Sequence, residues 1–113
     1  MKYFDLKEFN CTHSDENEMK PKFLEKIDEL RDRCGFSFFI VSGYRCPWHP
    51  AEMKKEKPGT HSRGIAADIR VSGGNDRYIL VQKALEMGFT GIGIAETFIH
   101  LDTRSDTPVI WSY

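Results

Sequence analysis

Three residues of this chain have the types that bind a catalytic metal ion: His61, Asp68 and His100. They lie in the segments GTHSRGIAADI and FIHLD. Two neutral imidazole nitrogens and one carboxylate oxygen suit a catalytic zinc ion, because three protein ligands leave the fourth tetrahedral position open for water. A single histidine or aspartate on a polar strand face is more often simply solvated. The three together predict a zinc site and a hydrolytic reaction.

The residues around these ligands alternate as they do in β-strands. In the strand predicted at 65–70, Asp68 lies on the face opposite the large apolar side chains. In the strand predicted at 98–102, His100 and Asp102 lie on the polar face. If the two strands are neighbours, the second histidine and the aspartate can meet. The first histidine would come from the preceding loop, where a glycine allows the backbone to turn into the strand.

An arginine lies upstream of the first histidine, at the end of an apolar run. Residues 36–41 (FSFFIV) are apolar and aromatic enough for a buried central strand, which opens into Ser42-Gly43-Tyr44-Arg45. Arg45 suits the recognition of a carboxylate or an oxyanion, because its planar guanidinium offers paired donors. A surface ion pair is the alternative for an arginine taken alone. Its place ahead of the histidine and the aspartate favours a role in the site.

The order of these motifs resembles a known family. Ser-Gly-Tyr-Arg, a loop with glycine and proline, His-x-x-Gly-x-Ala-x-Asp-Ile and Phe-Ile-His-x-Asp together are similar to the zinc D-alanyl-D-alanine peptidases. These peptidases share a superfamily with lysostaphin-type enzymes and the hedgehog signalling domain. A single-domain form recurs among bacteriophage lysis enzymes. The resemblance covers roughly residues 36–104.

The resemblance implies a role for each matching residue. His61, Asp68 and His100 fall on the family's zinc ligands, and Arg45 falls on the arginine that holds the substrate or the developing oxyanion. Asp102 matches the acidic residue two positions after the last ligand. The implied cofactor is Zn²⁺, and the implied substrate is a peptidoglycan stem peptide. The implied fold is that of the hedgehog and DD-peptidase domains.

Further substrate contacts are expected near the arginine, from Ser42, Tyr44 and Trp48. Trp48 lies in the loop CPWHPAEMKKEKPGT, which is placed to rim a cleft between the arginine and the first ligand. Such loops more often form a short helix and solvated turns. One departure from the family lies here as well, because Gly59 stands where many relatives have serine.

The general base is also not in its usual place. Relatives usually carry an acidic residue or a histidine three positions before the last zinc ligand, and here that residue is Thr97. Glu96 comes one position earlier, and on an uninterrupted strand it shares a face with His100 because their separation is even. We therefore predict Glu96 as the base that takes a proton from water and passes it to the leaving amine. Glu96 as a turn residue is the alternative, with His49 or Asp102 as the next candidates for the base.

The remaining pattern predicts two helices that pack against the sheet. The first spans 21–34, between a proline at its start and a glycine past its end, and its apolar stripe is Phe23, Ile27, Leu30 and Cys34. The second spans 76–87, and its apolar stripe is Ile79, Leu80, Ala84 and Leu85. After the last strand only a short tail with Trp111 is expected. The fold class is α+β, a small, mostly antiparallel sheet with packed helices in one domain of residues 1–113.

Composition narrows the possible partners and settings. The formal net charge is −1 and there is no block of Lys or Arg, so nucleic-acid binding is not expected. The amino-terminal segment lacks the apolar run of a signal peptide or membrane span, which predicts synthesis in the cytoplasm and action at the cell wall only after release. The cysteines, Cys11, Cys34 and Cys46, are odd in number and lack CxxC spacing, which predicts free thiols. A monomer is the expected state.

Three functions remain open from the sequence. The first is a zinc DD-carboxypeptidase or endopeptidase that cuts an amide bond next to D-alanine. The second is a zinc-containing binding module without hydrolysis, as in the hedgehog branch, and the displaced glutamate favours it. The third is a structural component of a virion or tail.

Overall fold

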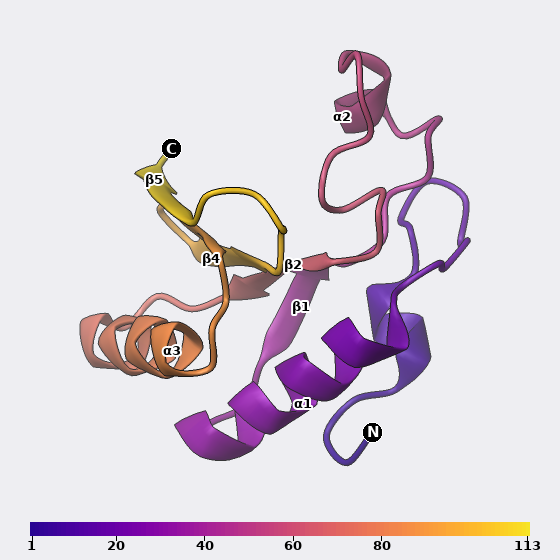
Figure 1. Ribbon diagram of the computed structural model, residues 1–113. Coiled ribbons are helices and arrows are strands. Elements are labelled where there is room, and N and C mark those ends of the chain that lie inside the picture. Colours follow the sequence, from indigo (N-terminus) through magenta and orange to yellow (C-terminus); the bar gives the residue numbers. More distant parts are fainter.

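The computed structural model describes residues 1–113 and contains a five-stranded sheet with two long helices against one of its faces (Figure 1). The strands are β1 (Phe39–Ser42), β2 (Ala66–Arg70), β3 (Gly91–Ile94), β4 (Phe98–Asp102) and β5 (Val109–Ser112). The helices are the 3-10 helix η1 (Leu6–Phe9) and the α-helices α1 (Pro21–Cys34), α2 (Pro50–Met53) and α3 (Gly74–Glu86). The predicted α+β class with a mostly antiparallel sheet is confirmed.

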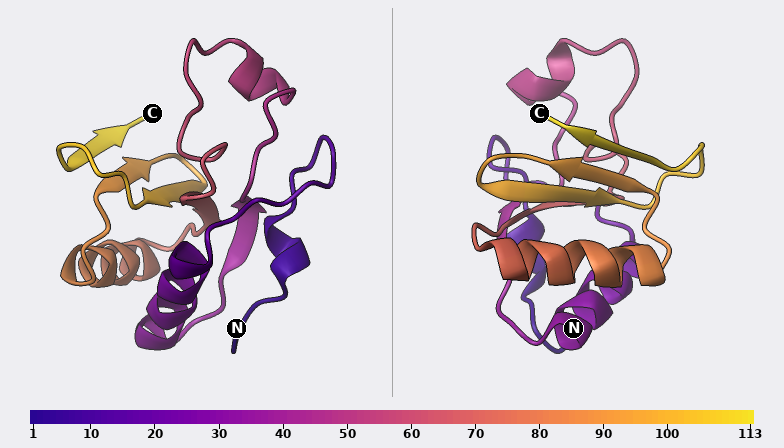
Figure 2. Two further views of the ribbon diagram at one scale, coloured as in Figure 1. Left: turned by 45° about the vertical axis from the view of Figure 1, so that its right-hand side comes forward. Right: turned by 90° about the vertical axis from the view of Figure 1, so that its left-hand side faces the viewer.

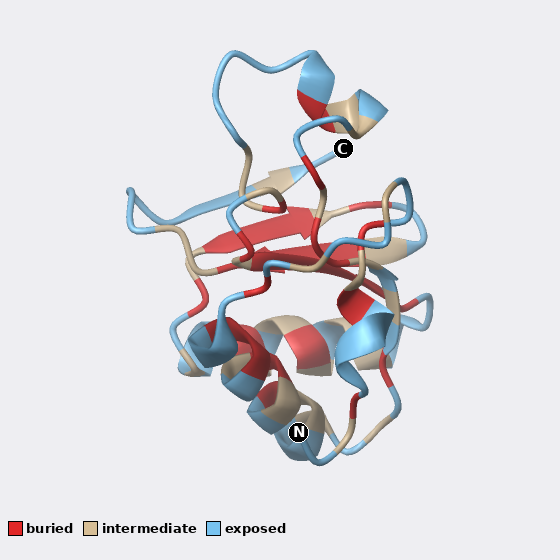
Figure 3. Ribbon diagram, turned by 90° about the vertical axis from the view of Figure 1, so that its right-hand side faces the viewer, coloured by how far each residue is buried: buried red, intermediate tan, exposed pale blue.

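The order of the strands in the sheet is β1-β2-β4-β3-β5. All neighbouring pairs are antiparallel except β3 and β5, which are parallel. Helices α1 and α3 cover one face, whereas α2 and its long loop stand on the other side of the sheet (Figure 2). One face of the sheet therefore packs on the core, and the opposite face is left to carry polar side chains. The buried strands of the sheet lie between helices α1 and α3 on one side and α2 with its loop on the other (Figure 3).

Helix α1 has the ends that its sequence predicts. Pro21 occupies the first turn, where its missing N–H costs no hydrogen bond, and Gly35 ends the helix in the left-handed region with φ +76°. The predicted stripe faces the core, with Leu24 added to it. Cys34, at the end of the stripe, is only half-buried because the helix leaves the core there.

Helix α3 begins two residues before the predicted start and ends one residue before the predicted end. Leu80 and Ala84 are fully buried, but Leu85 is 59% exposed, so its predicted burial is wrong. The reason is geometric: neighbouring residues on a helix are about 100° apart, and the stripe that α3 presents to the sheet is too narrow to include both Ala84 and Leu85.

The predicted central strand is an edge strand. Strand β1 begins at Phe39, three residues after the start of the apolar run, and pairs only with β2. Phe38 packs into the core, whereas Phe39 is 58% exposed and lies under the guanidinium of Arg70, 4.6 Å from the ring centroid. The apolar run resembled a strand buried on both faces, but its outward aromatic ring is covered by a cationic side chain and water.

The segment predicted as a tail forms strand β5, which pairs with β3 at the other edge of the sheet. The prediction missed it because Val109, Ile110 and Trp111 are too few for a periodic signal, and pairing with a distant strand defines them. Cys11, Cys34 and Cys46 are free thiols, as expected. None of the helices has the length and apolar character that a membrane crossing requires.

Candidate metal centre

A row of paired residues crosses the sheet on the face away from α1 and α3. Asp68 on β2 pairs with His100 on β4, which pairs with Gly93 on β3, which in turn pairs with Trp111 on β5. Directly paired residues have their Cβ atoms about 5 Å apart on the same face. The predicted neighbourhood of β2 and β4 is therefore confirmed, and it brings Asp68 and His100 together.

Glycines on β3 make room for the larger side chains of this row. A Cβ atom at Gly93 would lie 2.7 Å from the Trp111 ring, and one at Gly91 would lie 2.2 Å from the Asp102 carboxylate. The sequence GIGI thus places isoleucine on the core face and glycine on the polar face. In the absence of these two side chains, Trp111 lies over the strand and approaches the His100 ring, with 5.2 Å between the ring centroids.

The first histidine comes from a tight turn before β2. The N–H of Gly64 donates to the carbonyl of His61 at 3.2 Å, and Gly64 adopts a positive φ of +74°. A Cβ atom there would lie 2.2 Å from the carbonyl oxygen of Glu18, so glycine is required both by the backbone conformation and by the close approach. The N–H of Arg45 donates to the same His61 carbonyl at 3.3 Å, which joins the arginine loop to this turn.

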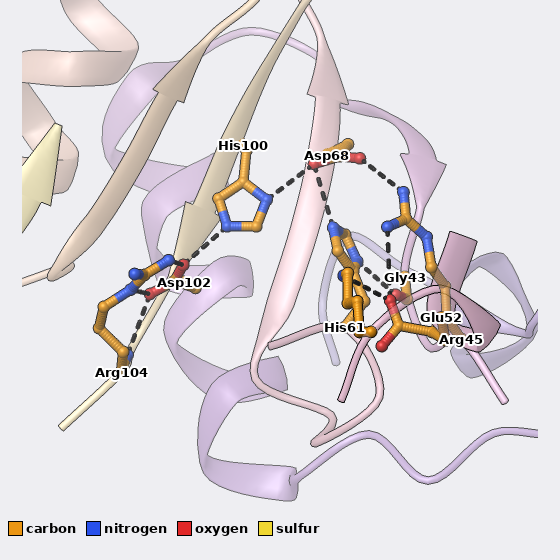
Figure 4. Close-up of polar contacts among 9 residues, drawn as sticks. Gly43, Arg45, Glu52, His61, Asp68, His100, Asp102 and Arg104 are labelled. Carbon is orange, nitrogen blue, oxygen red and sulfur yellow. Dashed lines mark hydrogen bonds and ion pairs between the residues drawn. The ribbon is translucent and has the colours of Figure 1, made fainter. Parts of the chain in front are cut away.

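These elements bring one nitrogen from each histidine to a single oxygen of Asp68 (Figure 4). Nε2 of His61 lies 3.3 Å from Oδ1 of Asp68, and Nδ1 of His100 lies 3.1 Å from the same oxygen. All three residues are buried, and one ligand atom from each lies within 4.8 Å of the others. The predicted set therefore forms a compact candidate metal site.

The outer nitrogen of each imidazole is fixed by an acceptor. Nδ1 of His61 donates to the carbonyl of Gly43 at 2.8 Å, and Nε2 of His100 donates to Oδ2 of Asp102 at 2.7 Å. A neutral imidazole carries one proton, so the inner nitrogens then present lone pairs to the carboxylate oxygen of Asp68. Lone pairs and an anionic oxygen at these distances need a cation between them. The donor set and its outer hydrogen bonds match those of zinc sites, so the residues fit this metal.

The ionisation of the site follows from the same contacts. Burial opposes the charged form of Asp68, but in the metal-free site its contacts with His100 and His61, in which an inner nitrogen carries a proton, outweigh burial and hold the pKa of this carboxyl well below its usual range. Burial likewise opposes the charged form of His100, but hydrogen bonds to Asp102 and Asp68 raise the pKa of its imidazole. When no metal ion is bound, these contacts with the two carboxylates favour the protonated form of His100.

Asp102 connects His100 to an arginine that the sequence did not single out. Arg104 donates from Nε to Oδ1 of Asp102 at 2.9 Å and from Nη2 to Oδ2 at 2.7 Å. Burial opposes ionisation of Asp102, but these bonds and the one from His100 lower the pKa of its carboxyl. Asp102 is thus a fully buried acceptor that orients His100 and is poorly suited to accept a proton from water.

The comparison with known families agrees with this geometry. The sequence model described as Peptidase M15 matches residues 2–102. The chain belongs to the Peptidase M15 family. It is therefore a zinc metallopeptidase by family, with His61, Asp68 and His100 as the candidate metal site. No curated protein matches the chain in a sequence search.

The metal site of this M15 peptidase opens into a cavity of about 440 Å³. The cavity wall contains the three candidate ligands, the basic residues Arg45, Lys55, Arg63 and Arg104, and the aromatic residues Phe98, Trp111 and Tyr113. Asp68 is the only carboxylate in this wall. The cavity is large enough for a short stretch of peptide and carries an excess of positive charge.

Arg45 reaches the cavity, as predicted, and is held loosely. Its Nη2 lies 3.5 Å from Oδ2 of Asp68 and its Nη1 lies 3.9 Å from Oε2 of Glu52. Its Nε is buried and has no hydrogen-bond partner. Glu52 itself is almost fully buried on α2, where it also accepts from Lys55 at 2.7 Å and from the N–H of Gly59 at 3.0 Å. The guanidinium therefore retains donors for a ligand in the cavity.

The other three predicted substrate contacts do not line the cavity. Tyr44 is 2% exposed and donates from its hydroxyl to Oε2 of Glu18 at 2.8 Å, so its ring belongs to the core. Trp48 is 66% exposed on the turn before α2. Ser42 pairs with Asp68 across β1 and β2, beside a β-bulge, without reaching the cavity wall. Their roles as substrate contacts stay predictions without support from this arrangement.

The geometric argument for Glu96 is wrong, because the strand is interrupted. Strand β4 begins at Phe98, and Ala95 and Phe98 close a turn through an N–H to carbonyl bond of 3.0 Å. Glu96 is exposed in this turn and does not line the cavity. The alternative that the sequence left open, a turn residue between two strands, describes its position. His49, the next candidate, caps α2 through an Nδ1 that accepts from the N–H of Ala51 and is also absent from the cavity wall.

Several residues that shape the site carry no motif that marks them in the sequence. Trp111 and Tyr113 lie on or just after β5, and Arg104 lies between β4 and β5, beyond the matched range of the family model. The alternation of glycine and isoleucine on β3 was the available signal, because it implies large neighbours on the glycine face. Glu52 carried no signal, because its burial depends on the fold of the α2 loop.

We predict that the purified protein binds about one equivalent of zinc. His61→Ala and His100→Ala should each lose it, because either change removes one of three inward donors. His49→Ala is the matched control and should retain the metal, since His49 does not line the cavity. Elemental analysis after dialysis measures the stoichiometry. Full zinc content in both ligand variants would show that the metal is held elsewhere.

We further predict that Asp102→Asn weakens zinc binding by about 10–100-fold, because the carboxylate that orients His100 is lost. Asp106→Asn makes the same change in charge on an exposed residue of the following loop and should leave the affinity unchanged. Competition with a chromophoric chelator measures both affinities. Equal affinities for the two variants would exclude an orienting role for Asp102.

Proposed function

We propose that the protein is a zinc peptidase that hydrolyses an amide bond next to D-alanine in peptidoglycan stem peptides. The observation that carries the proposal is the buried His61, Asp68 and His100 set at the base of a cationic cavity that Arg45 also lines. The peptidase family supports hydrolysis of a peptide. The choice of wall peptides rests on the resemblance of the motifs to D-alanyl-D-alanine peptidases.

The residues of the site have separate proposed roles. His61, Asp68 and His100 would hold the zinc ion, which when bound supplies Lewis-acid polarisation of the scissile carbonyl and lowers the pKa of water. Arg45 would donate to the substrate carboxylate or to the oxyanion, with donors that its distant carboxylate partners leave available. Trp111 lies against the His100 ring and forms part of the cavity wall, where it would offer an apolar surface to the bound peptide.

A zinc-containing binding module without hydrolysis is the second candidate. It is favoured by one observation, the absence from the cavity wall of any carboxylate besides Asp68. Such a module would keep the metal centre and the cationic cavity and would bind peptides without cutting them. The two functions differ in whether a bound peptide is cleaved.

Incubation of the zinc-loaded protein with defined muropeptides tests the proposal. Mass spectrometry should show release of D-alanine from a carboxypeptidase, or a severed cross-link from an endopeptidase. Intact substrates after prolonged incubation would favour the binding module. We further propose host lysis as the setting, because the motifs resemble those of bacteriophage lysis enzymes.

We predict that Arg45→Lys keeps the fold and the zinc but lowers kcat/KM by about 10²–10³-fold, because a point charge cannot reproduce two directed donors. Arg70→Lys is the control, since Arg70 is exposed and absent from the cavity wall. Circular dichroism and metal analysis verify folding and loading in both variants. Parental activity in Arg45→Lys would remove the arginine from the mechanism.

For Glu96→Gln we predict parental zinc content and nearly parental activity, because the side chain is exposed on a turn outside the cavity. Loss of a general base would instead lower the rate by about 10²–10⁴-fold while the zinc is retained. Muropeptide cleavage under identical conditions distinguishes the two results. A loss of that size would restore Glu96 as the base and would require the β3–β4 turn to move toward the cavity.

A further inference from the structure

The basic residues of the cavity wall differ in how they are neutralised. Arg104 forms a two-point ion pair with Asp102, and Lys55 contacts Glu52 at 2.7 Å. Arg45 lies between Asp68 and Glu52 at 3.5 and 3.9 Å. Each of these three cations therefore has at least one carboxylate of the protein within ion-pair distance.

Arg63 is the exception. No carboxylate lies within 4.0 Å of its guanidinium, and its side chain makes no hydrogen bond, although it lines the same cavity. A cation at the surface needs no partner, because water solvates it. Arg63 is exposed in this way, but it also lines the cavity, where a bound peptide would displace part of that water and place its own anionic group next to the guanidinium.

The backbone of Arg63 is fixed relative to the metal site. It lies in the turn that carries His61, and its N–H donates to the carbonyl of Gly59 at 3.1 Å. The next residue, Gly64, adopts the left-handed conformation against the carbonyl of Glu18. The turn that positions the first metal ligand therefore also positions an unpaired guanidinium two residues away.

We propose that Arg63 binds a carboxylate of the peptide substrate that lies beside the scissile amide, so that the site prefers acidic peptides to their amidated counterparts. This inference rests on the proposed peptidase function and names a determinant of specificity within the same cavity. The planar guanidinium can donate two parallel hydrogen bonds to the two oxygens of a carboxylate. A carboxamide has only one acceptor oxygen, so it can accept only one of them. Arg45 remains the donor for the reacting group, and Arg63 recognises a second group.

The test uses a matched pair of stem peptides that differ only in a free carboxylate or its carboxamide. Binding is followed by the fluorescence of Trp111, which lines the cavity, in zinc-loaded protein that carries Trp48→Phe. Trp48 is 66% exposed and absent from the cavity wall, and its replacement leaves Trp111 as the only tryptophan of the chain. This protein should bind the acidic peptide about five- to tenfold more tightly than the amidated one.

Arg63→Gln in the same background should bind both peptides with the affinity of the parent for the amidated one. Arg63→Lys should restore part of the preference. Lys57→Gln is the matched control, because Lys57 is an exposed cation of the same loop without an ion-pair partner and does not line this cavity. It removes the same charge and should leave the preference intact. Circular dichroism verifies that the variants are folded.

The results separate this inference from the proposed function. Preferential binding that disappears in Arg63→Gln supports the role of Arg63 even if neither peptide is cleaved. If the parent cleaves both peptides and binds them with equal affinity, the role of Arg63 is contradicted and the proposed peptidase function stands. Equal or absent binding in the parent, or a preference that survives in Arg63→Gln, overturns the inference.

Discussion

The arrangement of the site depends on how the negative charge of the buried Asp68 carboxylate is neutralised. Asp68 is 4% exposed, and an unpaired carboxylate at that depth would cost several kcal/mol. Its oxygens are instead contacted by His61, His100 and Arg45. These residues come from the turn before β2, from β4 and from the loop after β1. The attraction of one anion for cationic and donor groups thus joins three segments that are distant in the sequence, and it creates the place for a metal ion.

The sheet turns this local requirement into a rigid arrangement. Apolar side chains on the core face of β2 and β4 bury against α1 and α3, which fixes the register in which Asp68 faces His100. A slip of one residue would bury the polar row and expose the core row. The hydrophobic effect therefore holds the metal ligands in position, although no ligand takes part in the core.

Strand β3 links the metal centre to the carboxyl-terminal part of the chain. Its glycines admit the Asp102 carboxylate and the Trp111 ring, which contact His100 from the side away from Asp68. Arg104 lies 5.2 Å from the Trp111 ring and also neutralises Asp102. The family model matches residues 2–102, so Asp102 is the last matched residue. The metal centre lies within the matched range, and Arg104 and Trp111, which complete this part of the cavity wall, lie beyond it.

The sequence by itself determined the metal centre, because alternation on a strand decides the face of each side chain and the required ligand types are few. His61, Asp68 and His100 meet as predicted, and helix α1 has the predicted ends for equally local reasons. Only the tertiary structure decided that β1 is an edge strand, that Glu96 lies in an exposed turn, and that Tyr44 belongs to the core. Each of these depends on which distant segment packs against the residue. Local periodicity carries no information about that neighbour, since contacts between distant segments are selected by the packing of the whole chain.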